Sequence, residues 1–540
     1  MSTSGNDITA AINRFGLGAK PGEMASVQDP RAWLNAQVAH GAEDGKAFAE
    51  LPSSLDYLRE EARLLATRRE FKQGGRGRRR FLLGPAQPTS SSDQARATAD
   101  LKRALKPYRE EERKDLLAEA AARYRVAITT ETPFVERLVH FWSNHFAVSI
   151  DKRPARLFAS PMEREAIRAH VTGRFADMLL AVETHPAMLL YLDNVRSVGP
   201  NSPLGRRIAM RLARKGDQDQ GKAGGLNENL GREAMELHTV GVNAGYTQSD
   251  VTEFSRALTG WSIPLPRDFA NGRRPQSAFV FRAGAHEPGS RRVMGKTFPE
   301  GGFEQGKAIL EFLARQPATA KHLSLKLAQH FVSDDPPRSL VDRMAKSYLE
   351  HDTDLAAVYR TLIASPEAWE PDARKFKTPQ DFVISSLRAA QIDLGDRPQP
   401  VLALLKNLGE PAFDPRSPAG FSDSSANWID ADGLWKRVQA AEALSSRVVQ
   451  ANVRPLAFAQ DILGPLLDDD TAQAIRRAES PRQAHATLFA CPAFQWHQFL
   501  YRGDAFFQES GNVFDRHRHV VLDRAAFGLL RFRHVFAQLP

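Results

Sequence analysis

Residues 227–241, NENLGREAMELHTVG, place acids, amides, an arginine and a histidine in a run with helical spacing. At about 100° per residue, Asn229, Glu233 and Glu236 fall on one narrow stripe that adjoins an apolar line of the same helix. A stripe of this kind is expected to be half-buried, and carboxylates are rarely buried without a partner. Carboxylates held at the edge of a core are also the groups that metal sites and acid–base catalysis use.

Two interpretations of this helix stay open. Arg232 lies one turn from both Glu228 and Glu236, and Asn227 is a good N-cap, so the first is a salt-bridge and capping network, which the spacing favours. The second is a pair of carboxylates held for a metal ion or for acid–base chemistry. His238 is predicted to lie on the far side of a straight helix from Glu233, so one helix cannot bring both to one ion.

A second polar pattern lies in residues 132–149, TPFVERLVHFWSNHFAVS. Thr132 followed by proline predicts a capped helix start. Glu136, His140 and Asn144 follow at intervals of four and form one polar stripe, whereas His145 lies on the apolar side. A histidine on an apolar face is usually a core residue bonded to a backbone carbonyl, but beside an acid on a neighbouring helix it can act as a ligand or base.

Residues 283–298, AGAHEPGSRRVMGKTF, contain a near match to a phosphate-binding loop. Five residues separate Gly289 from Gly295 where that loop needs four, and Pro299 opposes the helix that must follow, so a nucleotide loop is excluded. His286 and its acidic neighbour Glu287 remain candidate polar groups on a turn.

The elements that must position these side chains are mostly helical. Apolar residues three and four apart recur along the chain, filled in with Ala, Leu, Arg and Glu, which are strong helix formers. Strand signals are confined to 276–284 and 291–298, which predict one small hairpin near 276–298. We therefore expect an all-α, mainly helical fold: a large multi-helix body with that single hairpin.

Composition narrows the function classes. The 540 residues carry a surplus of nine basic residues, mostly within 68–80 and after Tyr501, which does not favour nucleic-acid binding over solvated surface. Cys491 is the only cysteine, so neither an internal disulfide nor a cysteine-based metal site can form, and its apolar surroundings predict a buried, inert thiol. With no apolar run of spanning length and no signal-like segment, we expect no membrane span and a cytoplasmic location; export with a signal-bearing partner stays open.

Several blocks of this sequence resemble those of a large bacterial family known as DUF1800, a domain of unknown function. The resemblance runs in order from about residue 8 to about residue 497, and its blocks are long and unusual. The blocks that carry it are RFGLGAKPGE (14–23), ERLVHFWSNHFAVS (136–149), NENLGREAMELHTVGV (227–242), GYTQSDVTEFSRALTGW (245–261), HEPGSRRVMGKTF (286–298), KFKTPQDFVISSLRA (375–389) and SPAGFSDSSANWIDADGLWKR (417–437).

The resemblance implies a mostly helical fold, no established reaction, and an association with exported, sulfatase-like proteins of the DUF1501 family. Two positions depart from the family pattern, since Glu287 stands where Asp is usual and Phe421 where Trp is favoured. The positions of this chain that correspond to the family's recurring polar and glycine residues are Glu136, Asn144, His145, Asn227, Glu228, Asn229, Arg232, Glu233, Glu236, Asp250, Arg256, Trp261, His286 and Gly289.

These observations predict four regions: an N-terminal helical segment (1–65), a basic flexible loop rich in Gly, Ser and Pro (66–96), a DUF1800-like helical core (97–498) and a basic C-terminal extension (499–540). The function hypothesis is a metal- or acid–base-dependent enzyme with a buried Glu/His/Arg cluster between helices. The alternative is a non-catalytic assembly or chaperone-like partner of a DUF1501-type protein, in which the same cluster is a structural salt-bridge network.

The enzyme hypothesis has two overlapping sets of candidate residues, one catalytic and one metal-binding. A site without cysteine suits iron, manganese or zinc as the divalent cofactor, with no basis in the sequence for choosing among them. The candidate catalytic residues are Glu233, Glu236, His145, Arg232 and His286, and the candidate metal ligands are Glu136, His145, Glu233, Glu236 and His286, expected to converge on one point.

Overall fold

A computed structural model of the chain describes residues 5–42, 46–82, 91–215, 225–269, 274–449 and 453–498. Helices dominate these residues, so the expected mainly helical fold is confirmed. The α-helices are α1 Gly5–Thr9, α2 Glu23–Ser26, α3 Pro30–His40, α4 Ser54–Leu82, α5 Ser91–Ala104, α6 Lys106–Thr129, α7 Pro133–His145, α8 Ala159–Met162, α9 Phe175–Glu183, α10 Pro186–Tyr191, α11 Pro203–Lys215, α12 Asn229–Glu233, α13 Gln248–Ala257, α14 Phe303–Ala314, α15 Pro317–Phe331, α16 Arg338–Glu350, α17 Leu355–Ala364, α18 Pro379–Ala389, α19 Gln399–Asn407, α20 Ala431–Val449, α21 Pro455–Leu463, α22 Asp469–Arg476, α23 Pro481–Ala490 and α24 Pro492–Gln495.

Shorter turns of other helix types join these elements. Three of them have the wider π geometry, in which the hydrogen bond spans five residues instead of four. The π-helical turns are η1 Ala10–Phe15, η3 Glu163–Ile167 and η6 Ala234–His238; the 3₁₀ turns are η2 Arg153–Ala155, η4 Arg168–His170, η5 Asn194–Arg196, η7 Pro266–Asp268, η8 Ala283–Ala285, η9 Pro366–Trp369, η10 Ser425–Asn427 and η11 Gly464–Leu466.

Four short strands form two separate antiparallel pairs. Strand β1 (Trp261–Ser262) pairs with β2 (Val280–Phe281), and β3 (Arg291–Val293) pairs with β4 (Lys296–Phe298). A hairpin is present as expected, but it is confined to 291–298, and the expected pairing of 276–284 with it is wrong. The cause is the β3–β4 turn, in which Met294 and Gly295 both have positive φ, the conformation of a tight two-residue hairpin turn.

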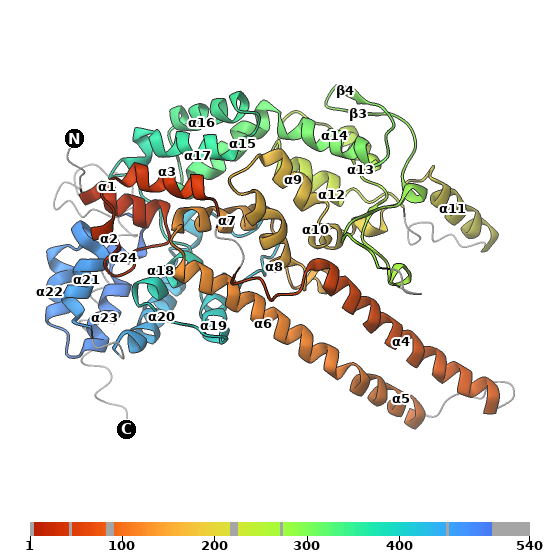
Figure 1. Cartoon of the computed structure of the whole chain (residues 1–540), viewed down its shortest axis with the longest axis horizontal. Coiled ribbons are helices and arrows are strands. Elements are labelled where there is room, and N and C mark those ends of the chain that lie inside the picture. Colours follow the sequence, from red (N-terminus) through yellow and green to blue (C-terminus); the bar gives the residue numbers. More distant parts are fainter. Residues whose placement is uncertain are drawn as a thin grey trace.

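A long helical arm projects from the body (Figure 1). Helix α4 runs out and α5 and α6 return beside it, and the hydroxyls of Thr67 and Tyr108 lie 3.3 Å apart across the pair. The expected flexible loop at 66–96 is therefore wrong for 66–82 and 91–96, while 83–90 lie outside the described residues. Arg, Lys, Leu and Gln are good helix formers, and they outweigh the cost of about 1 kcal/mol for each glycine of this segment.

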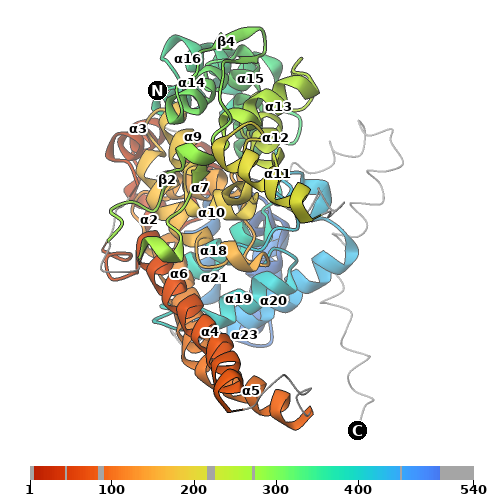
Figure 2. The same cartoon turned by 90° about the vertical axis from the view of Figure 1, so that its right-hand side faces the viewer.

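Two hydrophobic cores hold the body together. The first packs α3, α7, α9, α10 and α13–α17, and the second packs α18–α24 against α6. The N-terminal turn η1 belongs to both, since Phe15 lies in the first core and Ile12 in the second. Figure 2, turned by 90°, shows the arm extending away from both cores. No helix within the described ranges is long and apolar enough to cross a membrane.

Candidate functional site

The acid-rich motif of residues 227–241 folds as α12 followed directly by the π turn η6. Leu230, Ala234 and Met235 are fully buried and anchor the motif in the first core. Helix α12 begins at Asn229, and Asn227 lies before it, where its side-chain oxygen accepts from the backbone N–H of Asn229 at 2.9 Å. The polar side chains that follow are therefore fixed to a rigid, buried backbone.

The π turn changes which side chains share a face. In an α-helix, residues five apart point about 140° away from each other, whereas in a π turn, whose bonds span five residues, they point in similar directions. Glu233 and His238 are five residues apart across η6, and His238 is the charged group that acts most strongly on the pKa of Glu233. The expectation that His238 lies on the far side from Glu233 is therefore wrong, because it assumed a straight α-helix.

We name the group Glu183, Glu233, His145, His238 and His322 the acid–histidine cluster. The Nδ1 atom of His238 lies 2.6 Å from Oε1 of Glu183, at the end of α9, and both side chains are completely buried. Because the acceptor is a carboxylate, Nδ1 donates to it, and Nε2 is the ring nitrogen without a hydrogen bond to a described residue. This pair lies at the centre of the cluster.

Two further histidines surround the pair. The Nε2 atom of His145, at the end of α7, lies 3.2 Å from the carbonyl oxygen of His238, and Nε2 of His322, in α15, lies 3.3 Å from that of Leu237. Burial, followed by the charge of Lys326, holds the pKa of His145 well below its usual value and lowers that of His322 to about 4. Both rings are therefore neutral near pH 7 and donate Nε2–H to these carbonyls.

Three buried atoms of the cluster make no hydrogen bond with any described residue. They are Oε2 of Glu183, Nε2 of His238 and Nδ1 of His145. A buried acceptor without a partner costs about 1–3 kcal/mol, so three in one cluster need an explanation. Buried atoms of this kind also occur elsewhere among the described residues, Nε of Arg137 and Nε2 of His330 among them.

Glu233 and His322 are the two half-buried members of the cluster. Burial raises the pKa of Glu233, opposed most strongly by His238 and supported by the negative charge of Glu236. Tyr191 and Tyr246 are also half-buried, and the negative charge of Glu233 contributes to the raised pKa of each. Glu233 is therefore the acid of the cluster that is accessible to solvent.

The other charges of α12 and η6 form the salt-bridge network that the spacing favoured. Arg232 contacts Glu228 at 3.2 Å and Glu236 at 3.4 Å, and it donates to Gln248 at 2.9 Å. Glu236 also bonds the hydroxyl of Tyr246, whose pKa burial and this bond raise to about 12. Arg232 and Glu236 thus hold the rim beside Glu233.

Glu136 belongs to a different site. It lies nine residues before His145 on α7, and nine residues turn an α-helix by about 180°, so the two side chains point in opposite directions. Both Glu136 oxygens are taken by Arg168, at 2.5 and 2.8 Å, and His140 lies 3.4 Å away. This ion pair holds the pKa of the buried Glu136 well below its usual range.

His286 is also outside the cluster. Its Nδ1 atom donates to the carbonyl oxygen of Thr259 at 2.9 Å, and its ring packs on Phe281. Trp261 is buried nearby and packs on Phe303, so this turn is part of the first core.

The other polar residues of the family pattern support the fold. Asn144 clamps Phe421, accepting from its N–H at 2.7 Å and donating to its carbonyl oxygen at 2.9 Å. Asp250 forms a capping box with Thr247, and Arg256 pairs with Glu253. Thr132, by contrast, stands at the N-cap of α7 without a capping bond from its side chain.

The residues predicted to bind one metal do not fit that role. Glu136 is bonded to Arg168, Glu236 to Arg232 and His286 to a backbone carbonyl. Within the part of the chain that the structure describes, no three His, Cys, Asp or Glu side chains are arranged to hold an ion. The expected convergence of the five predicted ligands on one point is therefore wrong, because their helices aim them at separate partners.

Sequence reasoning missed Glu183, His322 and Lys326. Glu183 ends the apolar run MLLAVE, and a single acid in such a run is itself a signal of a buried partner. His322 and Lys326 lie one turn apart on α15, on a face that resembles an ordinary solvated stripe in the sequence. Nothing local in that pattern indicates that the stripe packs against η6.

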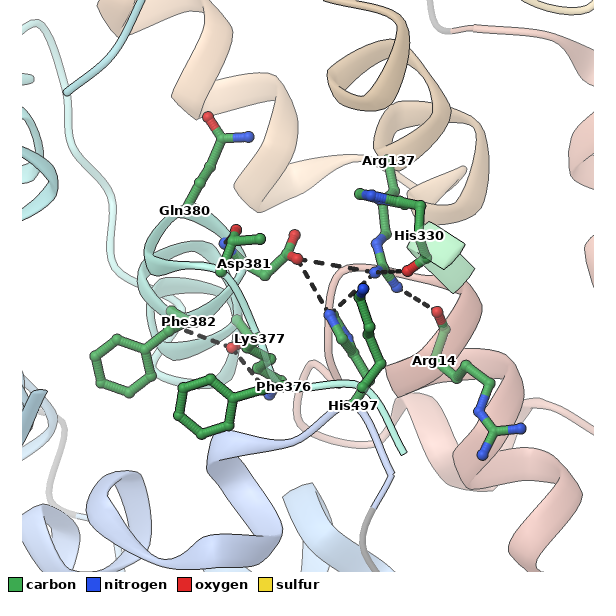
Figure 3. A network of polar contacts seen from close by, with 12 residues as sticks. Arg14, Arg137, His330, Phe376, Lys377, Gln380, Asp381, Phe382 and His497 are labelled. Atoms are coloured by element: carbon green, nitrogen blue, oxygen red, sulfur yellow. Dashed lines mark hydrogen bonds and ion pairs between the residues drawn. The ribbon is translucent and has the colours of Figure 1, made fainter. Parts of the chain in front are cut away.

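A second buried polar network lies where the N-terminus, α7, α18 and residue 497 meet (Figure 3). We name Arg137, Asp381, His497 and His330 the Arg137 network. Arg137 donates to the backbone oxygens of Arg14 and of His330, the latter at 3.2 Å, and lies 3.8 Å from Oδ2 of Asp381. Arg137 holds the pKa of Asp381 well below its usual range, against the effect of burial.

His497 completes the Arg137 network. Burial, with the charge of Arg137, lowers the pKa of its ring to about 3, so the ring is neutral. Its Nδ1 donates to the carbonyl oxygen of Asn13 at 2.8 Å, and its Nε2 lies 3.0 Å from a guanidinium nitrogen of Arg137 and 3.1 Å from Oδ2 of Asp381. The network thereby joins residues that are 484 positions apart in the sequence.

The fold and the cluster define a class: a mainly helical protein with a buried carboxylate–histidine pair, in a cluster whose half-buried members are Glu233 and His322. Residues 10–496 match the family model described as "Protein of unknown function (DUF1800)". The chain therefore belongs to the DUF1800 family. No curated protein and no solved structure matches it.

Proposed function

We propose that the acid–histidine cluster is an active site that works by general acid–base catalysis, with Glu233 as the group that exchanges a proton with substrate. The observation that carries the proposal is the buried Glu183–His238 contact of 2.6 Å beside the half-exposed Glu233. A carboxyl group with a raised pKa can act as an acid near neutral pH, where an ordinary glutamate cannot.

The other residues of the cluster act through Glu233. When Glu233 takes a proton from substrate, it passes that proton to the free Nε2 of His238, and Glu183 stabilises the imidazolium that forms; when Glu233 gives its own proton to substrate, the imidazolium returns one to it. His145 and His322 stay neutral and hold the carbonyls of His238 and Leu237, so they fix the backbone of η6. Arg232 and Glu236 are positioning residues of the rim, and His286 takes no part because its ring bonds Thr259.

The test compares two neighbouring carboxylates. Glu233→Gln removes the group that exchanges the proton, and Glu236→Gln removes the partner of Arg232 and Tyr246. Thermal unfolding and turnover of a panel of chromogenic esters, phosphoesters and glycosides would be measured for both variants and for Glu304→Gln, at an exposed position of α14, as a control. We expect Glu233→Gln to abolish turnover at an unchanged or higher Tm, and Glu236→Gln to lower the Tm.

A structural role is the second candidate, and the Arg137 network favours it, since that network shows that this chain uses buried charges to join distant segments. In that case the protein would be a non-catalytic partner, for which a DUF1501-type protein remains the proposed companion. A fall in Tm for Glu233→Gln as large as that for Glu236→Gln would favour this role and contradict the catalytic one.

A further inference from the structure

Helix α11 (Pro203–Lys215) lies at one edge of the molecule, at the right in Figure 1 and facing the viewer in Figure 2. None of its described residues belongs to either of the two large hydrophobic cores. Its sequence, PLGRRIAMRLARK, contains five basic residues and no acidic one. The helix is therefore a basic element outside the packed body of the protein.

The first turn of α11 is fixed to the body. The hydroxyl of Ser202 accepts from the backbone N–H of Gly205 at 3.0 Å and so caps the helix. Gly205 packs on the carbonyl oxygen of Gly199, where a Cβ atom has no room. Just before the helix, the backbone N–H and the side-chain amide of Asn201 donate to Glu287 at 2.8 and 2.6 Å. These contacts hold the following turns of α11 in one place on the surface.

The side chains of α11 are exposed in an unusual combination. Met210 is 62% exposed and Leu204 41% exposed, so two large apolar side chains of one helix lie in solvent. Three arginines, Arg206, Arg207 and Arg211, are exposed beside them, and none forms an ion pair with a described residue. A surface that matches this helix must therefore offer negative charge and an apolar layer together.

The order of residues in α11 is amphipathic. At about 100° per residue, Leu204, Ile208 and Leu212 form an apolar line, of which Leu204 is the most exposed, and Arg207 and Arg211 form a second line beside it. Helices of this pattern lie in the plane of a membrane surface, where the apolar line enters the headgroup region and the arginines extend to the phosphates. Four to eight basic residues on an amphipathic helix are typical of binding to anionic lipids.

We propose that α11 binds the surface of an anionic membrane, with its arginines on lipid phosphates and with Leu204 and Met210 between the headgroups. A nucleic acid offers the same phosphates but no apolar layer, so the two exposed apolar side chains favour a lipid surface. A helix of this kind lies on the membrane and does not span it. The proposal does not depend on catalysis at Glu233, because α11 contains no residue of the acid–histidine cluster.

The first test is co-sedimentation of the full-length protein with vesicles. We expect binding to vesicles of phosphatidylcholine mixed with phosphatidylglycerol, weakened by added salt, and no binding to phosphatidylcholine alone. Because each basic residue near an anionic surface contributes about fivefold, Arg207→Gln/Arg211→Gln should bind about 25-fold more weakly. The control Arg338→Gln/Arg360→Gln makes the same charge change at exposed positions of α16 and α17 and should bind as the wild type does. No binding to the anionic vesicles, or equal losses for the two double variants, would overturn the proposal.

A second test places the contact on the helix. Cys491 is buried, so a cysteine introduced by Met210→Cys can be labelled selectively with a polarity-sensitive fluorophore. We expect its emission to shift to shorter wavelength when anionic vesicles are added, and no shift for the same label at Asp342→Cys, an exposed position of α16. Equal shifts at the two positions, or none at 210, would contradict the proposal. Tighter binding of a double-stranded oligonucleotide than of the anionic vesicles, lost in Arg207→Gln/Arg211→Gln, would assign α11 to nucleic acid and overturn it as well.

Discussion

The acid–histidine cluster and the Arg137 network are both groups of charged and imidazole side chains in the core, and they differ in charge and in access to solvent. In the Arg137 network all four side chains are buried and an arginine faces an aspartate, although Nε of Arg137 and Nε2 of His330 make no hydrogen bond with a described residue. In the cluster a buried carboxylate faces a histidine, and Glu233 and His322 are half-buried. The paired charges of the network join segments of the fold, and the cluster, which reaches the surface, is where we propose that chemistry takes place.

The strongest test of this comparison is to break the Arg137 network. Asp381→Asn leaves the charge of Arg137 buried without compensation, and removing one partner of a buried ion pair typically costs about 3–5 kcal/mol. We expect a free energy of unfolding in urea lower by about that amount. The double variant Arg137→Met/Asp381→Leu should recover most of the loss; if it does not, the geometry of the bonds to Arg14 and His330 matters more than the charge.

The pH dependence of stability provides a second test, at a buried lysine next to the Arg137 network. Lys377 precedes Asp381 by one turn and lies 4.2 Å from the ring centre of Phe494, and burial lowers its pKa to about 7. Between pH 7 and 10.5 the unfolded chain holds a proton on this lysine that the folded protein lacks, so stability rises with pH in that window, by up to about 1.4 kcal/mol per pH unit. Lys377→Met should remove this slope in urea titrations, whereas Lys346→Met, at an exposed position, should keep it.

The smallest effect is expected in the acid–histidine cluster itself. In Glu183→Gln the amide oxygen can still accept from Nδ1 of His238, so we expect a change in unfolding free energy of less than about 1 kcal/mol. Glu183→Leu removes the acceptor and should cost about 1–3 kcal/mol. A loss for Glu183→Gln as large as that for Asp381→Asn would mean that the two regions do not differ in the way described.

Periodicity predicted the helical fold and the Arg232 network because both depend on residues close in sequence. Arg232, Glu228 and Glu236 are one turn apart, and their contacts follow from helix geometry alone. The same periodicity placed Glu136 and His145 on different faces of α7. The prediction that both residues bind one metal ion did not take that spacing into account. Residues 66–82 were predicted as a loop because of their glycines. They belong to helix α4, and the helices that return beside it, α5 and α6, come later in the chain, so the local sequence alone does not reveal this support.

The cluster itself could not be assembled from the sequence. Its members come from α7, α9, α12, η6 and α15, and their approach depends on tertiary packing that no local pattern encodes. The π turn is a further obstacle, since the sequence AMELH carries no feature that distinguishes it from an ordinary α-helical turn. Calculating directions at 100° per residue therefore separated Glu233 from His238.

The π turn at 234–238 has a consequence for how this family can change. A π turn holds one residue more than the α-helical turn it replaces, so it can arise by an insertion and be lost by a deletion. Loss of one residue between Glu233 and His238 would place the two residues four apart in an ordinary α-helical turn, where side chains also point in similar directions. A homologue whose motif is one residue shorter could therefore keep both the fold and the acid–histidine cluster of this protein.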